Sequence, residues 1–487
     1  MKRIHIYTAI IMLMMPVLAG AQALKGSYFL DNSMNRHRMN PAFTPRANYF
    51  QLVGIGNLGT GVVTNLDIPT FFYPQNGQLL NFLHQNVSVD QFSKALPQHP
   101  HLDADLNTTL LSFGFFTKQK SYWTFDLDMR VMADVDLPRD LFMLMKKGAG
   151  SAGDSFNVGN MNAYASGAVQ AALGYSRDII KGLRAGVKAR FIAPVAYMGL
   201  NLENVRLTTG RDKWNISTEG YAHAAMRGLD MSIPQGETMP AFAFDMNRML
   251  SDGVLAGWGY SFDLGVEYKF EMEGAFNGFT VSAAVTDLGQ IFYAQDAVHS
   301  FSSKGSVDWV GFQDVSMTNT DFEAALDDLA SKAEGLLNLE ETQSEGSLMK
   351  SSMPRVYAGV EVPFLWNTMS VGLLYSARFS HSYARQELTA SYNLKPCKWF
   401  GLGLNWSFLN TIQTLGWMIE FTPKVGPTFY IGGDYLPVAF AKAPVLDKWA
   451  GTDMMESMGL DGWYLPMGLR LNLNFGIAFT LGSKYGR

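Results

Sequence analysis

A two-residue alternation of apolar and polar side chains runs through residues 123–137. Apolar side chains occupy the odd positions and mostly ionic side chains the even positions, with Met132 as the exception. Because successive side chains of an extended chain point to opposite faces, this stretch predicts one strand with an oily face and an ionic face. The ionic face carries Asp126, Asp128, Arg130, Asp134 and Asp136.

The same alternation recurs in stretches of similar length along the chain. It is clearest in residues 183–191, 260–270, 400–408 and 469–481, and in the first of these the polar face carries Arg184, Lys188 and Arg190. Strands of soluble proteins average about 5 to 6 residues, whereas a tilted membrane-crossing strand needs about 9 to 11. The length of these segments therefore favours strands that cross a bilayer.

An all-β fold follows, in which the sheet closes on itself as a transmembrane antiparallel β-barrel. Closure removes unpaired strand edges, whose backbone N–H and C=O groups would find no hydrogen-bond partner in hydrocarbon. The large apolar faces then contact lipid, while the polar faces line the interior. We expect one barrel over residues 47–487 with about 14 strands, in a range of roughly 12 to 16.

The first 21 residues have the parts of a secretory signal peptide. Lys2 and Arg3 precede an apolar run over residues 4–18, and the small residues Ala19 to Ala21 follow. We expect export, cleavage after Ala21 and a mature chain that begins at Gln22. The apolar run is too short for a membrane-spanning helix.

Three segments do not alternate. Residues 22–46 are polar and irregular. Residues 138–147 start with a proline and end in two lysines before a glycine, which predicts a short helix. Residues 320–339 begin with a Thr-x-x-Glu capping box and carry an apolar stripe, which predicts a second helix. Either helix could pack on a barrel rim, close it as a lid or dock a partner.

The overall composition excludes some partners. Charged residues make up 17% of the chain and the net charge is -5, with both signs interspersed, so no basic face is available for nucleic acid. Cys397 is the single cysteine and cannot form an internal disulfide, so we interpret it as a small buried apolar side chain.

The charges on the inward faces need partners. An unpaired buried charge costs several kcal/mol, so the aspartates of residues 126–136 should pair with Arg184, Lys188 and Arg190 across or along the lumen. Small side chains leave space beside the C-terminal strands, and residues 22–46 could fill that space as a plug. These small residues are Gly401, Gly403, Ser407, Gly476, Ala478, Thr480 and Gly482.

Signals for catalysis are weak. Ser155 in a Gly-Asp-Ser-Phe tetrapeptide, with Asp296 and His299, has the residue types of a GDSL-type esterase, but a glycine-serine loop surrounds the serine in place of a strand-to-helix turn. His84, His99 and His101 lack the spacing of a zinc site. We expect no enzyme activity, no cofactor and no metal.

Asn40, Pro41 and Ala42 precede the first long strand, and this placement resembles the long-chain fatty-acid transporter superfamily of outer-membrane barrels. There an Asn-Pro-Ala element lies in the hatch that plugs the barrel. The segments VTDLGQIFY at 285–293 and MPRVYAGVEV at 353–362 are similar to outer-membrane proteins of Bacteroidota within that group, some of whose relatives assist type IX secretion. Many such barrels end on an aromatic residue, whereas this chain ends on Arg487.

Two functions fit these features. The first is a plugged barrel, surrounded by outer-membrane lipid, that binds small hydrophobic molecules and lets them cross passively; apolar pockets would hold an acyl-like body and a few lysines or arginines an acidic head. The second is a non-transporting outer-membrane scaffold, or an accessory protein of secretion or surface assembly, whose loops hold a secreted or surface protein.

Overall fold

The structure is a computed structural model that describes most of the chain from Leu24 onward. The described ranges are 24–52, 56–75, 78–117, 121–147, 155–209, 214–232, 241–272, 278–309, 339–342, 347–379, 384–409, 412–436, 440–442, 464–466 and 470–482. The signal peptide expected over residues 1–21 lies outside them.

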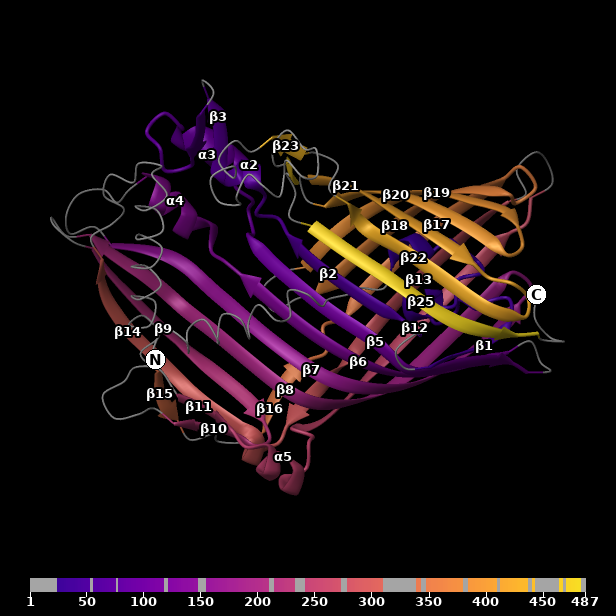
Figure 1. Ribbon diagram of the computed structural model, residues 1–487, viewed down its shortest axis with the longest axis horizontal. Coiled ribbons are helices and arrows are strands. Elements are labelled where there is room, and N and C mark those ends of the chain that lie inside the picture. The colour runs from indigo at the N-terminus through magenta and orange to yellow at the C-terminus, as the bar shows by residue number, and fades with distance from the viewer. Residues whose placement is uncertain are drawn as a thin grey trace, which may run out of the picture.

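The main sheet closes as an antiparallel barrel of 14 strands, as the sequence predicts (Figure 1). The first strand is broken into β1 and β2, and both halves pair with β5 on one side and β25 on the other, which closes the ring. In order around the barrel the strands are β1 (Asn48–Leu52) with β2 (Leu58–Thr64), β5 (His101–Phe116), β6 (Tyr122–Asp136), β7 (Ser155–Ile180), β8 (Leu183–Thr209), β12 (Gly257–Phe270), β13 (Phe279–Tyr293), β17 (Arg355–Phe364), β18 (Met369–Phe379), β19 (Ala384–Cys397), β20 (Phe400–Leu409), β21 (Ile412–Phe421), β22 (Gly426–Leu436) and β25 (Arg470–Leu481).

The wall forks at β8. Residues 183–192 of this strand pair with β12, whereas residues 196–209 pair with β9 (Trp214–Met226), which continues the sheet to β14 (Val298–Trp309) and β15 (Leu339–Thr342). β7 and β8 therefore extend well past the closed barrel and form a curved half-shell with β9 and β14 (Figure 1). β8 nevertheless remains one strand of 27 residues, because its pairing partner changes while the backbone stays extended.

The two rims of the barrel differ in the length of their connections. Next to the start of β1 and the end of β25, strands are joined by short turns such as residues 181–182 and 398–399. The opposite rim carries long connections such as residues 65–100 and 137–154. Outer-membrane barrels place short turns on the periplasmic side and long loops outside, so we refer to the inner rim and the outer rim.

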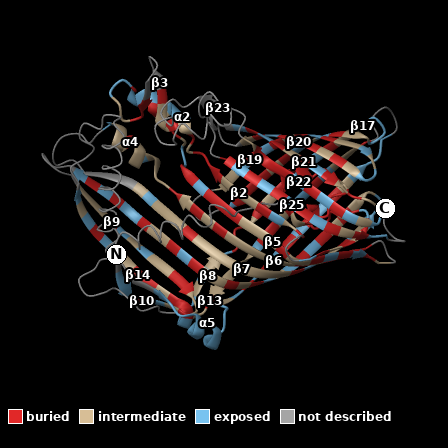
Figure 2. Ribbon diagram, viewed as in Figure 1, coloured by how far each residue is buried: buried red, intermediate tan, exposed pale blue. Residues whose placement is uncertain are grey.

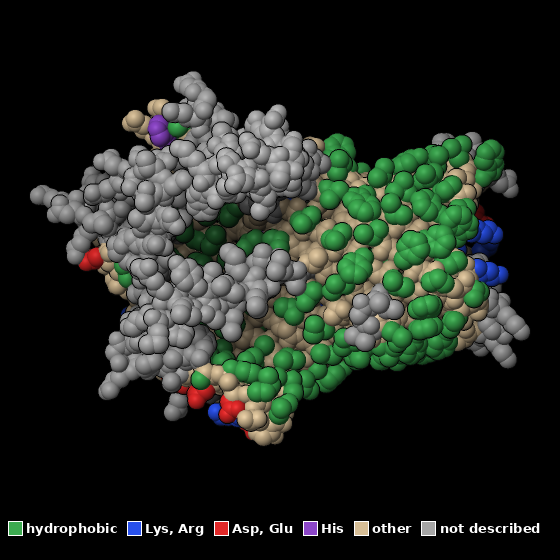
Figure 3. Space-filling model, in the orientation of Figure 1, with side chains coloured by type: hydrophobic (Ala, Val, Ile, Leu, Met, Phe, Trp, Pro, Cys, Tyr) green, Lys and Arg blue, Asp and Glu red, His purple; other side chains and the backbone are tan. Residues whose placement is uncertain are grey.

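Burial shows which face of the strands meets lipid. On β12, Phe262 and Leu264 are 50% and 52% exposed on the outside, whereas Ser261 and Asp263 on the inside are 0% exposed. Alternating buried and exposed bands follow the barrel strands (Figure 2), and hydrophobic side chains cover the outside of the described barrel wall (Figure 3). This arrangement is the inverse of a soluble core, and it confirms the predicted transmembrane barrel.

Short helices and hairpins decorate the rims. α4 (Arg139–Lys147) forms where the first helix was predicted. Residues 320–338 of the second predicted helix lie outside the described ranges. No helix within the described ranges is long and apolar enough to cross a membrane. The remaining elements are η2 (Lys25–Ser27), η3 (Arg36–Arg38), α2 (Ile68–Phe71), β3 (Phe72–Gln75), β4 (Gln78–Asn81), α3 (Val89–Ala95), β10 (Leu229–Ser232), β11 (Ala241–Phe244), α5 (Met246–Asp252), η4 (Gln295–Ala297), β16 (Leu348–Ser351), β23 (Phe440–Lys442) and β24 (Tyr464–Pro466).

Cys397 is only partly buried, so the expectation of a buried thiol was wrong. The pairing of β19 with β20 shifts register between Leu394 and Cys397. The strand therefore ends on an irregular stretch at the inner rim, where the two faces are no longer sorted into lipid and lumen.

Residues 24–46, which we call the N-terminal segment, lie inside the barrel. Nearly all of their side chains are buried, and they bond to strands on opposite sides of the lumen: Lys25 to Asp434 of β22, and Arg38 to Asp128 of β6. Within the segment only two short helical turns form, at η2 and η3. Its conformation is therefore set mainly by the wall that surrounds it.

Candidate functional site

The Asn-Pro-Ala element of the N-terminal segment rests on two glycines of the wall. Gly186 of β8 and Gly265 of β12 are paired across the sheet. A Cβ at Gly186 would overlap the backbone of Pro41, and a Cβ at Gly265 would overlap the side chain of Asn40. The two missing side chains create the seat for this turn.

Asn40 fixes the turn by three hydrogen bonds. Its Nδ2 donates to the carbonyl oxygens of Val266 at 3.1 Å and Ala283 at 3.4 Å, while its Oδ1 accepts from the backbone N–H of Ala42 at 2.9 Å. Asparagine combines one acceptor with two donors, so it can close the turn and dock it on β12 and β13 at the same time.

Asp126 is the centre of a buried polar cluster beneath this turn. Its carboxylate accepts from Lys188 Nζ at 2.9 Å and Ser112 Oγ at 2.8 Å, and lies 3.1 Å from His37 Nε2. Arg38 Nη2 approaches the same carboxylate at 3.4 Å. The pairing of the aspartate strand with Lys188 was predicted from the sequence; the two donors from the N-terminal segment were not.

His37 experiences competing effects inside this cluster. Burial lowers its pKa, Asp126 acts in the opposite direction, and Lys188 and Arg38 lower it further. The net shift of the His37 pKa is downward. Its Nδ1 lies 2.7 Å from the carbonyl oxygen of Met34, which orients the ring toward Asp126.

The other predicted lumen residues join different partners. Arg130 and Arg190 converge on Asp287 of β13, and Arg190 also donates to Asp263 at 2.9 Å. Arg184 donates to Thr44 of the N-terminal segment at 2.9 Å and lies 3.4 Å from Asp178. Two positions of β8 therefore bond to different partners: Lys188 bonds to Asp126 of β6, whereas Arg184 contacts Thr44 and Asp178.

Asp134 and Asp136 pair with arginines that the sequence analysis did not single out. Arg385 of β19 lies 2.7 Å from Asp134 and 3.0 Å from Asp136, and Arg378 of β18 lies 3.5 Å from Asp103 of β5. Strands β6 and β19 are far apart around the ring, so these contacts cross the lumen. Only the closed barrel shows which charges face one another.

Arg355 links this outer group of charges to the inner one. It lies 3.9 Å from Asp105 and 4.0 Å from Asp287. Arginines 385, 378, 355, 130 and 190 thus form a row that descends through the lumen against the aspartates of β5, β6, β12 and β13.

The start of the N-terminal segment is held on the opposite wall. The backbone N–H groups of Lys25 and Gly26 donate to Asp434 at 2.8 and 3.1 Å, and the Lys25 ammonium bonds to Glu387 and to Tyr435. Strand β20 and the end of β25 carry the small residues that predicted room for a plug. A Cβ at Gly403 would lie 3.0 Å from the Gly26 carbonyl.

Apolar contacts add to these polar anchors. Tyr28 packs edge-on against Phe29 and Phe43, each with ring centroids 4.9 Å apart, and lies 6.3 Å from Tyr357 of β17. Tyr28 also shares a hydrogen bond of 3.0 Å with Ser282, and burial raises its pKa to about 12. The N-terminal segment therefore has a small hydrophobic core of its own against β13, β17 and β18.

Around this segment the described lumen retains two small cavities. One, of about 70 Å³, is lined by Arg38, Asp128 and Arg190 among others. The other, of about 60 Å³, lies beside Lys25 and Arg385, and Arg355 and Tyr357 line both. Each has room for a few water molecules.

A far larger cavity, which we call the vestibule, lies at the outer rim. Its volume is about 680 Å³, and it is bounded by the half-shell, the start of α4 and Lys350 of β16. Its lining residues are Gln98, His99, Pro100, Asp136, Leu137, Pro138, Arg139, Asp140, Gly159, Asn160, Asn162, Ala163, Tyr164, Tyr197, Gly199, Leu200, Asn201, Tyr221, His223 and Lys350.

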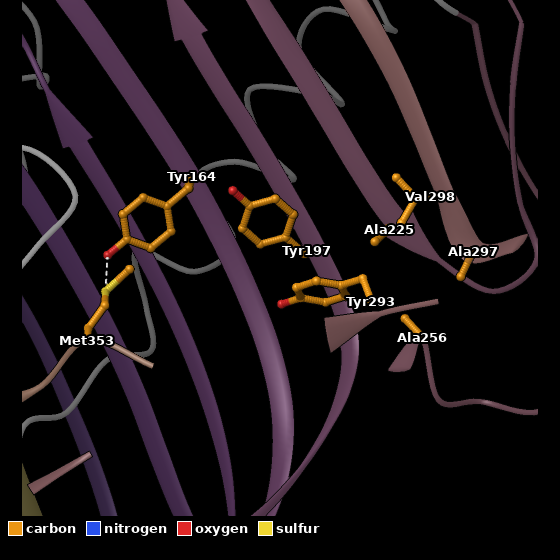
Figure 4. Packing of buried hydrophobic residues seen from close by; sticks show 8 residues of the cluster. All are labelled: Tyr164, Tyr197, Ala225, Ala256, Tyr293, Ala297, Val298 and Met353. Carbon is orange, nitrogen blue, oxygen red and sulfur yellow. Dashed lines mark hydrogen bonds between the residues drawn. The ribbon is translucent and has the colours of Figure 1, made fainter. Parts of the chain in front are cut away.

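Tyrosines form the apolar wall of the vestibule. Tyr164 and Tyr197 belong to a buried cluster at the fork, where Tyr164 donates to the Met353 sulfur at 2.8 Å and Tyr197 lies 5.1 Å from Tyr293 (Figure 4). Tyr221 is 37% exposed and accepts from Asn201 at 3.0 Å.

One cation of the vestibule has an unusual environment. The Lys350 ammonium lies 5.4 Å from the centre of the Tyr197 ring. No carboxylate lies within ion-pair distance of it among the residues whose positions are described. By contrast Asp136 is paired with Arg385, and Arg139 donates to Ser93. Lys350 is thus a candidate for holding an acidic group of a ligand.

The residues considered for a hydrolase have other contacts. Asp296 pairs with Arg227 at 2.6 Å, and His299 Nε2 lies 3.1 Å from the carbonyl oxygen of Leu229. Ser155 is the first residue of the long strand β7. Asp154 lies outside the described ranges.

Sequence comparison identifies the family. Residues 41–434 match the model of a family of unknown function, DUF5723, so the chain belongs to that family. The match starts within the Asn-Pro-Ala element and ends in β22. No curated protein sequence matches this chain.

Solved structures that resemble the chain are outer-membrane barrels. A FadL homologue of Pseudomonas aeruginosa has 11% identity and a TM-score of 0.38, with 93% of this chain and 95% of that chain covered. The toluene transporter TodX of Pseudomonas putida has 10% identity and a TM-score of 0.34 over 91% and 93%. The translocator domain of the autotransporter NalP from Neisseria meningitidis has 7% identity and a TM-score of 0.30 over 90% of each chain. At such values these likenesses add nothing to what the strand pairing itself shows.

Proposed function

We propose that this member of the DUF5723 family is an outer-membrane barrel that binds small amphipathic molecules in its vestibule and lets them cross passively. The observation that supports this most directly is the vestibule itself, a cavity of about 680 Å³ at the outer rim. Binding sites for small molecules typically have volumes of about 300 to 1,000 Å³ and mix apolar walls with a few polar groups.

The lining favours a ligand with an apolar or aromatic body and an acidic group. Tyr197 and Tyr221 offer ring faces to the body, and Lys350 offers a cation to the acid. Polar groups are more numerous here than a purely hydrophobic ligand requires, with Asn160, Asn162 and others on the wall. We therefore widen the expected class from hydrophobic to amphipathic molecules.

The route inward would follow the row of arginines. Arg378 donates to Tyr164 at 3.3 Å, and Tyr164 lines the vestibule while Arg378 lines the lumen cavity of about 60 Å³. One layer of side chains thus separates vestibule and lumen. Passage requires the N-terminal segment to shift, since the lumen cavities of about 60 and 70 Å³ do not admit such a ligand.

Naphthalene-2-sulfonate is a suitable probe, because its permanent charge keeps it from crossing pure lipid. Liposomes that contain the full chain should accumulate it faster than empty liposomes, and Lys350→Met should weaken its binding by about tenfold, corresponding to about 1.4 kcal/mol. The neutral naphthalene sulfonamide is the matched ligand and should bind both forms equally. Equal binding of the sulfonate to both forms would remove Lys350 from the site.

The packed lumen favours a second candidate, a non-transporting scaffold. The N-terminal segment is anchored on both sides of the barrel, by Asp434 and by Asp126 and Asp128. A barrel closed in this way can serve as a rigid base for its loops. Binding of the sulfonate without any uptake, combined with a protein that co-purifies through the outer loops, would favour this function.

A further inference from the structure

We propose that the outer wall carries a binding site for one acyl chain of a membrane phospholipid, in a groove formed by β6, β7, β8 and β12. The groove has a volume of about 450 Å³ and lies on the lipid-facing side of the barrel; of its lining residues, Ala172 and Arg190 also line the lumen cavity of about 70 Å³. It is lined by Phe125, Ala171, Ala172, Leu173, Ala189, Arg190, Phe191, Trp258, Gly259, Tyr260 and Phe262.

The groove arises from a contrast in side-chain size. Ala171 and Ala189 face outward from β7 and β8 and leave a depression. Large side chains border the depression: Leu173, Phe191 and Phe262 are 54%, 51% and 50% exposed. Elsewhere on β12 the outward positions carry larger side chains, such as Leu264 and Val266, which leave no comparable depression.

Its position on the wall determines the occupant. On β12 the outward side chains are apolar from Trp258, next to the fork, to Phe270 at the inner rim, and all but the half-buried Tyr268 are exposed. Trp258 is 52% exposed and stacks on Phe292 with centroids 4.9 Å apart, and tryptophan typically marks the boundary between hydrocarbon and headgroups. The groove therefore extends inward from the outer interface, within the hydrocarbon layer.

Exposed apolar side chains also lie beyond the Trp258 end of the groove, toward the outer rim. Val254 and Leu255, just before β12, are 38% and 45% exposed, and Met246 and Leu250 of α5 are 55% and 65% exposed. A lipid whose chain lies in the groove would have its glycerol and headgroup beside this segment. The apolar surface of the groove is thus continuous with the face that already contacts the bilayer.

Shape, rather than hydrophobicity, would make this site specific. Bilayer hydrocarbon is as apolar as the groove, so a chain gains little from transfer alone. An acyl chain that fits a groove lined by aromatic rings makes more dispersion contacts there than it would on a flat lipid-facing surface. One chain should therefore stay bound after the surrounding lipid has been removed.

Native mass spectrometry of the full chain, extracted from palmitoyl-oleoyl phosphatidylethanolamine vesicles, tests this. We expect one phospholipid to remain on the wild-type barrel under activation that strips the annular lipid. Ala171→Phe and Ala189→Phe, made separately, should each lower that occupancy at least fivefold by filling the depression. Ala185→Phe is the control, because residue 185 shares the strand and face of Ala189 but does not line the groove.

Three results would overturn the proposal. These are a wild-type barrel that retains no lipid, groove variants that retain as much as wild type, and a loss in Ala185→Phe equal to that in Ala189→Phe. Resistance of the unheated barrel to SDS shows whether each variant has folded. If one groove variant fails to fold, the lipid occupancy of the other variant, compared with that of the wild type, still tests the proposal.

Discussion

Arg38 of the N-terminal segment donates to Asp128 of β6 at 2.7 Å and joins a lumen segment directly to the barrel wall. The same guanidinium donates to Thr109 of β5 at 3.0 Å, and both side chains of the ion pair are only 11% and 13% exposed. Buried, hydrogen-bonded pairs of this kind fix position, because a single lost partner leaves the other charge unsatisfied.

Arg38→Met should therefore release the N-terminal segment from the wall. We expect the free energy that holds the N-terminal segment in the lumen to fall by about 3 to 5 kcal/mol, since Asp128 stays in the lumen wall and loses its cation. Limited proteolysis of residues 24–46 in the folded barrel and planar-bilayer conductance measure the release. Arg46→Met is the control: Arg46 is 41% exposed and lies 3.5 Å from Asp31, so it should cost less than about 1 kcal/mol.

Asp126 and Lys188 should show strong coupling. Asp126→Asn alone leaves the buried Lys188 ammonium without its carboxylate and should destabilise the barrel by about 3 to 5 kcal/mol. The double variant with Lys188→Met should cost less than the sum of the single variants, by about 0.5 to 3 kcal/mol. Urea unfolding of the reconstituted barrel provides the four free energies, and strict additivity would show that the pair does not interact.

Gly186→Ala should displace the Asn-Pro-Ala turn, because the added Cβ would overlap the Pro41 carbonyl. Overpacking of this kind typically costs about 1 to 3 kcal/mol. The barrel itself should still form, and residues 40–42 should become accessible to protease. At Gly167 the nearest atom to an added Cβ is Val131 Cγ2 at 3.9 Å, so Gly167→Ala should leave the turn seated.

Acid should loosen the N-terminal segment through His37. Burial lowers the pKa of His37 in the seated state, whereas the released residue has an ordinary pKa of about 6.5. The released state thus binds more protons, so seating is unaffected above about pH 6.5 and weakens as the pH falls below that value, by at most about 1.4 kcal/mol per pH unit.

Proteolysis of residues 24–46 as a function of pH measures this dependence. His37→Gln should flatten the curve in that window, because glutamine can hydrogen-bond to Asp126 but cannot gain a proton. Asp126, Lys188 and Arg38 are the charged groups that face the imidazole. An unchanged slope in His37→Gln would show that His37 does not carry the pH dependence.

The alternation of side chains determined the fold class and about how many strands form it. Residues 123–137 and 260–270 alternate because lipid and lumen impose opposite polarity on the two faces of every strand, so the pattern is local and can be read along the chain. The charge of each inward face could be predicted for the same reason. Asp126 and Lys188 were singled out on this basis alone.

Tertiary structure decided which of these charges meet. Arg385 and Asp136 lie 249 positions apart and pair across the lumen only because the ring closes, and a two-residue period carries no information about the opposite wall. The fork at β8, the vestibule it encloses and the fit of Pro41 on Gly186 likewise depend on strand register. Sequence periodicity sets the direction in which a side chain points, whereas register and closure determine what it contacts.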